Sequence, residues 1–376
     1  MSSVAPRLDY LLRSVSGHAS RVPQGPMTAR PILFWACAGL ASVLAVTVPV
    51  AAAWELNRPI RNAGPVFGLT SGPGELLVAD AGQGVVRLRN EKTELVVALP
   101  GVVDVEVVNP TLMFAITGGG AGPTAAKLWR IEHGQADLLA DLGAFEATIN
   151  PDGADVNPNP FDLAVLPDGR ILVADAGANT LLIVDQNGAV DWVATLPTEL
   201  VSTANVKTLV HCPAGPANIC GLPAQIPAQA VTASVAIGPD GAYYLGELKG
   251  FPAPTGASRI WRIDPEAHHV HCGAGAPECS VVANNLTSVI DLAFDKAGTL
   301  YVTELDEASW FAIEVVHTPT TGTVNACELD PASGTYGCSP MVTGLAQPTA
   351  VAVDHKKVYV TNNSLAPGAA EVVRIK

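Results

Sequence analysis

The sequence predicts an all-β protein made of many short strands joined by tight turns. Gly (35) and Pro (30) are frequent among the 376 residues, and only 15% of the residues are charged. This composition suits apolar strands and turns, and it argues against a disordered chain or a helical bundle. No long amphipathic helical pattern appears after residue 55. A strand-turn-strand motif that recurs six times narrows the fold class further.

Residues 1–53 are set apart from the fold as an amino-terminal signal segment. Four arginines precede an apolar run over residues 32–54: Arg7, Arg13, Arg21 and Arg30. The run ends in the small-residue string VPVAAA, which is typical of an export signal cleaved near residues 51–53. A start at Met27 would give a signal of ordinary length. The alternative is an uncleaved anchor, since about 20 apolar residues span a bilayer; Pro49 and the alanines favour cleavage. We therefore expect a secreted or periplasmic protein that touches a membrane only if this segment is kept.

The charge balance of residues 54–376 restricts the partners. Setting aside the four Arg and one Asp of residues 1–53 leaves 17 basic and 34 acidic groups, a formal charge of −17. Such a surface repels nucleic acid and anionic lipid. It would attract cations or basic ligands, although an acidic balance also serves solubility alone.

Six of the seven cysteines fall as close neighbours in the sequence. Cys37 lies in the signal segment, and the others form three local pairs: Cys212 with Cys220, Cys272 with Cys279, and Cys327 with Cys338. An even number of cysteines behind an export signal predicts three disulfides in an oxidising compartment.

The repeated motif is an alternating strand, a turn often built on Asp-Gly or Pro-Gly, and a second apolar strand. The copies are VFGLTSGPGELLVADAG, VVDVEVVNPTLMFAITGG, PFDLAVLPDGRILVADAG, TASVAIGPDGAYYLGEL, VIDLAFDKAGTLYVTEL and PTAVAVDHKKVYVTNN. Gly supplies the positive φ that such turns need, and Asp or Pro initiates them. A third strand usually follows, as in TLLIVD and SRIWRID.

The spacing of the copies predicts a six-bladed β-propeller with four-stranded antiparallel blades, covering residues 54–376. One position at the end of the second strand recurs in every copy: Asp80, Thr117, Asp175, Glu247, Glu304 and Asn362. Its spacings of 37, 58, 72, 57 and 58 residues exceed the roughly 40–50 residues of common blades, and the surplus lies in loops. A tandem pair of β-sandwiches is disfavoured because one motif runs through the whole chain.

Closure of the ring has a candidate at the chain ends. The chain stops at EVVRIK, the third strand of the last repeat, so that repeat lacks an outer strand. Residues 54–60 could supply it, and this pairing would remove an exposed sheet edge.

The repeats resemble six-bladed propellers of the NHL type and, more narrowly, the ScyD/ScyE family of exported bacterial propellers. The resemblance rests on FEATINPDGADVNPNPFDLAVLPDGRILVADAG (145–177), SVAIGPDGAYYLGELKGFPAPTGASRIWRI (234–263) and SVIDLAFDKAGTLYVTEL (288–305). It covers essentially all of the chain after the signal, and GELKGFPAPTGA is its most distinctive segment. The resemblance implies the fold and export, and it assigns no activity.

Two sets of acidic residues point to one end of the propeller's central channel. The first is the strand-end position, with Asp175, Glu247 and Glu304; the second lies near the start of the inner strands, with Asp104, Asp162 and Asp291. These six carboxylates predict a hard-cation site, for which Ca²⁺ is the expected ion, because such ions take six to eight oxygens. The alternative is that each acid bonds backbone N–H groups beside a turn in its own blade.

Long loops should gather on the same face, which we call the loop face. It receives the link between the second and third strands of each blade and the link to the next blade. Within residues 145–159, four oxygen-bearing side chains are predicted to contact a ligand: Glu146, Asn150, Asp152 and Asp155. The stretch lacks the EF-hand pattern, so a solvated Asx-turn loop is the alternative.

Two near-duplicate strings, VHCPAGPANIC and VHCGAGAPEC, place His211 and His271 beside cysteines. With His268 and His269 nearby, they suggest a transition-metal site. Oxidised cysteines supply no thiolate, however, so disulfide-closed loops are favoured over a metal site.

Three functions fit these features to different degrees. The favoured one is a non-catalytic, monomeric propeller of the cell envelope that binds a small molecule or an envelope protein on its loop face. The alternative is a metal-dependent hydrolase or lactonase of the gluconolactonase type. Phe161 and Ile290 stand where that group would have ligand residues, and Ala63 or a neighbour replaces its early Glu, which weighs against this alternative. A sugar or quinone dehydrogenase lacks a recognisable set of cofactor-binding Arg and His residues. No nucleophile-elbow, zinc-protease or phosphate-loop motif occurs after the signal.

Overall fold

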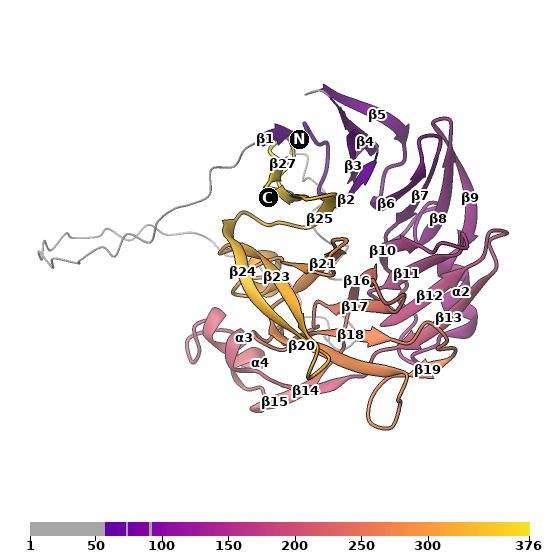
Figure 1. Cartoon of the computed structure of the whole chain (residues 1–376). Helices are drawn as coiled ribbons and strands as arrows, with labels where there is room; N and C mark the ends of the chain where they lie inside the picture. Colours follow the sequence, from indigo (N-terminus) through magenta and orange to yellow (C-terminus); the bar gives the residue numbers. More distant parts are fainter. Residues whose placement is uncertain (1–56, 73, 90–91) are drawn as a thin grey trace, which may run out of the picture.

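The structure is a computed structural model that describes residues 57–72, 74–89 and 92–376. Six of the sheets in the described part of the chain are set radially about one axis, which confirms the predicted six-bladed β-propeller (Figure 1). Each of these sheets is one blade, with its first strand innermost. The predicted signal segment, residues 1–53, lies outside the described residues. Among the described residues, no helix is long and apolar enough to span a membrane.

The first three blades follow one another along the chain. Blade 1 holds β2 (Val66–Gly72), β3 (Glu75–Asp80), β4 (Gly84–Arg89) and β5 (Lys92–Ala98). Blade 2 holds β6 (Val102–Asn109), β7 (Leu112–Thr117), β8 (Lys127–Glu132) and β9 (Gln135–Asp141). Blade 3 holds β10 (Pro160–Val165), β11 (Ile171–Asp175), β12 (Thr180–Val184) and β13 (Val190–Thr195).

The other three blades complete the ring. Blade 4 holds β16 (Thr232–Ile237), β17 (Tyr243–Glu247), β18 (Ser258–Ile263) and β20 (Cys279–Leu286). Blade 5 holds β21 (Val289–Phe294), β22 (Leu300–Glu304), β23 (Gly322–Asp330) and β24 (Thr335–Leu345). Blade 6 holds β25 (Val351–Asp354), β26 (Lys357–Asn362), β27 (Glu371–Arg374) and β1 (Asn57–Pro59).

Blade 6 is closed by the start of the described chain, as predicted. Strand β1 pairs antiparallel with β27, with Asn57 opposite Val373 and Pro59 opposite Glu371. The two strands lie side by side near the labelled termini (Figure 1). This pairing gives the last sheet its fourth strand and covers the edge of β27.

Apolar side chains between neighbouring blades form the core. Leu172 of blade 3 packs with Leu245 and Trp261 of blade 4 in one buried cluster. Leu77 of blade 1 and Val105 and Met113 of blade 2 belong to another. The alternation of the strands explains the arrangement, because side chains on each face of a blade point into the next blade.

Among the described residues, the helices lie in insertions between strands, and all of these insertions are loop-face links. They are α2 (Leu142–Ile149), α3 (Ala204–Leu209), α4 (Ala217–Cys220) and α5 (Trp310–Glu314). The link between blades 3 and 4 also contains a two-stranded sheet of β14 (Glu199–Ser202) and β15 (Gln225–Ala228). The opposite face carries the tighter hairpins, such as the Asp168-Gly169 turn, in which Gly169 has φ 86°.

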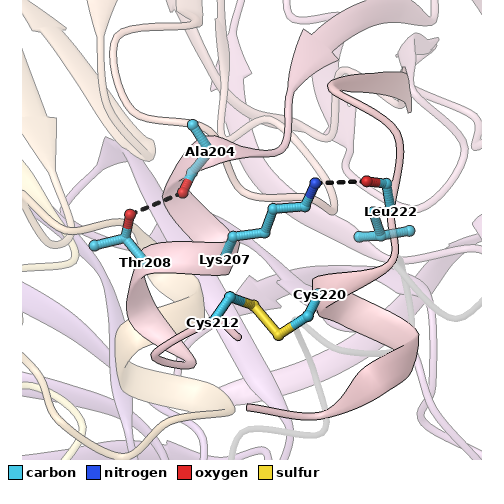
Figure 2. The surroundings of a disulfide bond; sticks show 6 residues. All are labelled: Ala204, Lys207, Thr208, Cys212, Cys220 and Leu222. Atoms are coloured by element: carbon cyan, nitrogen blue, oxygen red, sulfur yellow. Dashed lines mark hydrogen bonds between the residues drawn. A yellow bond between two sulfur atoms is a disulfide. The ribbon is translucent and has the colours of Figure 1, made fainter. Parts of the chain in front are cut away.

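All three predicted disulfides are present: Cys212–Cys220, Cys272–Cys279 and Cys327–Cys338. Figure 2 shows the first, which joins the turn after α3 to the end of α4. Beside it the ammonium of Lys207 donates to the carbonyl of Leu222. Cys327 and Cys338 are opposite each other on β23 and β24. The bonds agree with the predicted oxidising compartment.

Candidate functional site

Three aspartates of the central channel, Asp104, Asp162 and Asp291, lie two residues into the inner strands, directly after a β-bulge. The register shifts between Val102 and Asp104 in β6, between Pro160 and Asp162 in β10, and between Val289 and Asp291 in β21. The extra residue at each bulge is apolar and buried: Val103, Phe161 and Ile290. A bulge re-aims the side chains that follow it. The aspartates consequently face a central cavity, whereas the bulged apolar residues lie nearer the loop face.

Each channel aspartate also accepts a hydrogen bond from a backbone N–H group of the next blade around the ring. Asp104 Oδ2 accepts the N–H of Leu163 in blade 3 at 3.0 Å. Asp162 Oδ2 accepts from Val235 in blade 4 at 2.7 Å, and Asp291 Oδ2 accepts from Val351 in blade 6 at 2.6 Å. Within their own blades, Asp162 Oδ1 also accepts from Leu163 at 2.8 Å and Asp291 Oδ1 from Leu292 at 2.7 Å. The predicted alternative, a carboxylate bonded to backbone N–H groups of its own blade, therefore applies to these two acids, and bonds to the next blade add to it. Carboxylate oxygens carry further lone pairs, so these bonds leave acceptor capacity toward the cavity.

The cavity has a volume of about 270 Å³ and is lined by four acids: Asp104, Glu106, Asp162 and Asp291. None of the described residues that line it is Lys, Arg or His. Glu106 follows Asp104 by two residues on the same strand and accepts a hydrogen bond from Thr70 at 2.9 Å. In four of the other blades the corresponding position is alanine: Ala164, Ala236, Ala293 and Ala352. These small side chains leave the space open.

Glycine completes the ring of inner-strand positions in blade 1. A Cβ atom at Gly68 would lie 2.2 Å from Asp104 Oδ1 and 2.7 Å from Asp104 Cα. A larger residue would therefore displace the carboxyl group of Asp104.

The channel acids hold protons more tightly than ordinary carboxyl groups. Burial raises the pKa of Asp104 to about 6, although hydrogen bonds from Asp162 and from backbone N–H groups lower it. Burial and the charge of Asp104 raise the pKa of Glu106 to about 8. Burial and neighbouring acids also raise the pKa of Asp162, and burial raises that of Asp291 despite two backbone hydrogen bonds. A cation bound in the channel would favour the ionised forms of these carboxyl groups and so lower their pKa values.

The loop-face end of the channel is filled by apolar side chains. Phe67 of blade 1 and Phe161 of blade 3 meet edge to face, with ring centroids 5.5 Å apart. Blade 2 lies between those two blades in the ring, so the contact joins two blades that are not neighbours. Both rings belong to a buried cluster that also includes Val103, Ile290 and Trp310. The cavity extends instead toward the other ends of the inner strands, at Ile237, Phe294 and Val353. The expectation that acids ring the loop-face mouth is therefore wrong, because the bulged residues close that mouth.

The strand-end acids make a different kind of contact. Asp175 Oδ1 accepts the N–H groups of Asn159 at 2.7 Å, Gly177 at 3.0 Å and Ala178 at 3.0 Å. Asp80 accepts likewise from Ala63, Gly64 and Gly82. These acids hold the link that enters their own blade against the turn after the second strand. At these two positions the repeated acid therefore stabilises the turn by accepting backbone hydrogen bonds.

Glu247 and Glu304 are also engaged inside their blades. Glu247 accepts from the Trp261 indole at 2.8 Å and pairs with the Lys249 ammonium at 2.7 Å. Glu304 accepts from the Asn325 amide at 2.6 Å and from the Thr287 N–H. The six predicted ligands therefore fall into two groups. Asp104, Asp162 and Asp291 share the cavity; Asp175, Glu247 and Glu304 are outside its lining.

The four loop residues predicted to contact a ligand lie at and after α2. Glu146 is 1% exposed, and neither of its carboxyl oxygens has a hydrogen-bond partner among the described residues. Burial, with the charges of Asp175 and Asp152, raises its pKa to about 7. Asn150 ends α2 in the left-handed conformation, and Asp152 accepts from Asn179 at 2.9 Å. Asp155 is exposed.

The spacing of the channel acids tests whether they suit a directly coordinated ion. Ligands of one Ca²⁺ ion gather at 2.3–2.6 Å from it, so their oxygens lie close together. In the described part of the chain, one group of three such side chains (His, Cys, Asp or Glu) has its ligand atoms within 4.8 Å of one another: Asp191, His268 and His269. Asp104 and Asp162 share a hydrogen bond, but no three of the channel acids form such a group. The set suits a cation that keeps part of its water shell, or an organic ammonium group, better than a fully dehydrated ion.

Comparisons with known proteins give the fold and no family. No family model matches the chain, and no curated protein matches it. Among solved structures, the chain is similar to a streptogramin B lyase, with 11% identity and a TM-score of 0.51 over 86% of this chain and 89% of that one. A PQQ-bound aldose sugar dehydrogenase from Streptomyces coelicolor matches at 12% identity and a TM-score of 0.51, covering 86% and 99% of the two chains. A calcium-binding regucalcin from Agrobacterium tumefaciens matches at 12% identity and 0.50, covering 84% and 92%. These propellers share the architecture, and at such identities the likeness extends no further.

Proposed function

We propose that the protein is an exported, non-catalytic binding propeller of the cell envelope that holds a cationic group in its acid-lined channel. The observation that carries the proposal is the set of four carboxyl groups around one 270 Å³ cavity whose described lining has no basic residue. Their raised pKa values indicate an uncompensated site, and a bound cation would compensate it. Export and an envelope location are supported by the three disulfides and by the resemblance to the ScyD/ScyE propellers.

Because no three of the channel carboxylates converge within 4.8 Å, the site favours a hydrated divalent cation such as Ca²⁺ or an amine-bearing ligand. Coulomb attraction toward several carboxylates acts over longer distances than coordination and tolerates an intervening water. The cavity opens away from the loop face, so a ligand or a basic side chain of an envelope partner would enter from the face opposite α2, α3 and α5.

Calorimetric titration with Ca²⁺ and, separately, with spermidine tests the proposal. We expect binding at pH 8 with one or both, and a loss on the order of 10-fold in the variant Asp104→Asn/Glu106→Gln, since a unit charge about 4 Å away contributes on the order of 1 kcal/mol even in a water-like medium. Both substitutions keep the hydrogen-bond acceptors. Asp137→Asn, at an exposed acid on the outer strand of blade 2, is the matched control. Absence of heat with every cation, and of any shift in melting temperature with Ca²⁺ or EDTA, would overturn the proposal.

The hydrolase alternative receives no support from the channel. A metal-activated water requires ligands close enough to hold one ion, and the loop-face entrance above the acids is apolar. A panel of lactones with added Ca²⁺, Mn²⁺ or Zn²⁺ provides the corresponding check, and turnover that Asp162→Asn abolishes would favour the enzyme.

A further inference from the structure

The histidines beside the second disulfide lie against blade 3, although they belong to blade 4. The connection between β18 and β20 leaves blade 4 and adds the short strand β19 (Val270–His271) to the outer edge of blade 3. Strand β19 runs parallel to β13, with Ala194 opposite Val270 and Thr195 opposite His271. The Cys272 N–H donates to the Thr195 carbonyl at 2.9 Å, which fixes the register. This crossing brings His268 and His269 next to Asp191, which is 77 residues away from the first of them.

The three side chains converge through nitrogen and oxygen atoms that can bind a metal. Nε2 of His268 lies 3.0 Å from Asp191 Oδ2, and Nε2 of His269 lies 2.7 Å from Asp191 Oδ1. The two imidazole rings are 3.8 Å apart between centroids. Consecutive residues rarely point the same way in an extended chain. Here His269 has φ 54°, and this left-handed conformation turns both rings toward one carboxylate.

Neighbouring groups hold the ring of His269 in place and account for His271. The Trp192 indole stacks on His269 with centroids 4.6 Å apart and an interplanar angle of 16°. His271 is engaged elsewhere, since its Nδ1 lies 2.8 Å from the Thr195 hydroxyl. Cys272 and Cys279 are joined to each other and offer no thiolate. The available ligands are therefore two imidazoles and one carboxylate.

We propose that Asp191, His268 and His269 form a binding site for one divalent transition-metal ion, with Zn²⁺ as the expected ion. Imidazole nitrogen and carboxylate oxygen are ordinary zinc ligands, and three of them leave a fourth position for water. In a tetrahedral site with Zn–N of about 2.0–2.1 Å, neighbouring ligand atoms lie about 3.3 Å apart. The two distances from the histidine Nε2 atoms to the Asp191 carboxylate oxygens therefore need to increase by only a few tenths of an ångström. The side chains of Asp191, His268 and His269 are 47%, 64% and 44% exposed, so an ion can reach them from solvent.

The position of the site gives the ion a structural role. Asp191 belongs to β13 of blade 3, whereas both histidines belong to the connection of blade 4. A bound ion would link two blades outside their shared core, next to a strand pairing of two residues. Since metal binding to the folded state adds to folding free energy, occupancy should raise the melting temperature.

Titration of the purified protein, with disulfides intact, by Zn²⁺ and by Co²⁺ tests the site. We expect one equivalent to bind at pH 7.5, with a visible Co²⁺ spectrum typical of mixed nitrogen and oxygen ligands. His268→Ala and His269→Ala should each weaken binding by at least about 10-fold. His355→Ala is the matched control, since His355 is an exposed histidine 2.7 Å from Asp354 that belongs to no group of three ligands in the described chain.

Two further variants make the outcome decisive. Asp191→Asn should change the Co²⁺ spectrum while circular dichroism shows that the fold persists. Asp104→Asn/Glu106→Gln should leave the stoichiometric site intact, which separates it from the channel. Binding that survives loss of both histidines, or that disappears with the channel variant, would refute the site.

Discussion

The ammonium Nζ of Lys249 lies 2.7 Å from Oε2 of Glu247, and both side chains are inaccessible to solvent. Lys249 also pairs with Glu199 at 2.9 Å. Glu247 is therefore neutralised by a cation that the chain itself supplies, two residues further on. This pairing explains why an acid at the repeated strand-end position need not bind an external ion in blade 4.

Lys249→Met should destabilise the protein strongly. The substitution leaves the carboxylate of Glu247 buried without its partner, and breaking one side of a buried pair costs about 3–5 kcal/mol. Urea unfolding monitored by tryptophan fluorescence measures the change. Lys356→Met, at an exposed lysine, is the control. The double variant Lys249→Met/Glu247→Gln should recover part of the loss; a single-variant loss below about 1 kcal/mol would contradict the buried pair.

The channel should make stability fall as pH rises. In the folded protein Asp104 and Glu106 have pKa values of about 6 and 8, above their ordinary values of 3.8 and 4.5. Between those limits the folded state binds more protons than the unfolded chain, so their favourable contribution is complete below about pH 4 and is lost as pH rises through 6 to 8. Glu106→Gln should flatten the curve above pH 6. Denaturant midpoints from pH 5 to 8.5 give the measurement, and identical curves for both proteins would contradict it.

Glu146→Gln should stabilise the protein above pH 7. Both carboxyl oxygens are buried without hydrogen-bond partners among the described residues, so ionising this group inside the fold is costly. In the unfolded chain the acid ionises near pH 4.5, whereas the pKa of about 7 in the folded protein keeps it neutral until the pH approaches 7. The cost therefore grows from pH 4.5 to 7, and the gain should be much smaller at pH 5. Thermal melts at both pH values measure it. Glu94→Gln, at an exposed acid, should change neither melt.

Phe161→Ala should weaken the closure of the loop face. Removing a buried aromatic side chain costs about 3–5 kcal/mol, and here it also removes the ring contact with Phe67. Chemical denaturation provides the value, and Leu200→Ala, at an exposed side chain, is the control. If a channel cation binds, its entry rate should rise in the Phe161 variant because the loop-face end becomes open. A change below 1 kcal/mol would argue against the apolar closure.

The fold could be predicted from the sequence because the same strand-turn-strand pattern recurs six times. Alternating apolar strands, the Asp168-Gly169 type of turn and the three cysteine pairs each depend on residues close together in the chain. Closure by β1 was also predictable, since β27 otherwise ends the sheet as an unpaired edge.

The site was predictable only in part, because its contacts join residues far apart. The inner-strand position of Asp104 could be read from the repeat, and Glu106 could have been found by continuing two residues along the same strand face. From the sequence alone Phe161 is an ordinary strand residue; its place in the bulge before Asp162 and its contact with Phe67 of blade 1 become apparent only in the structure. Asp191 meets its histidines only because β19 leaves its own blade, which no local pattern indicates.

The pairing of β1 with β27 has a consequence for how the chain folds. Asn57 and Val373 are more than 300 residues apart, so the last sheet is completed only after nearly the whole chain is available. A linear array of repeats can gain stability one unit at a time, but a closed ring cannot. Bringing such distant segments together is slow, and a partly folded ring would leave β27 open to pairing with other chains. We therefore expect folding to compete with aggregation at this final contact.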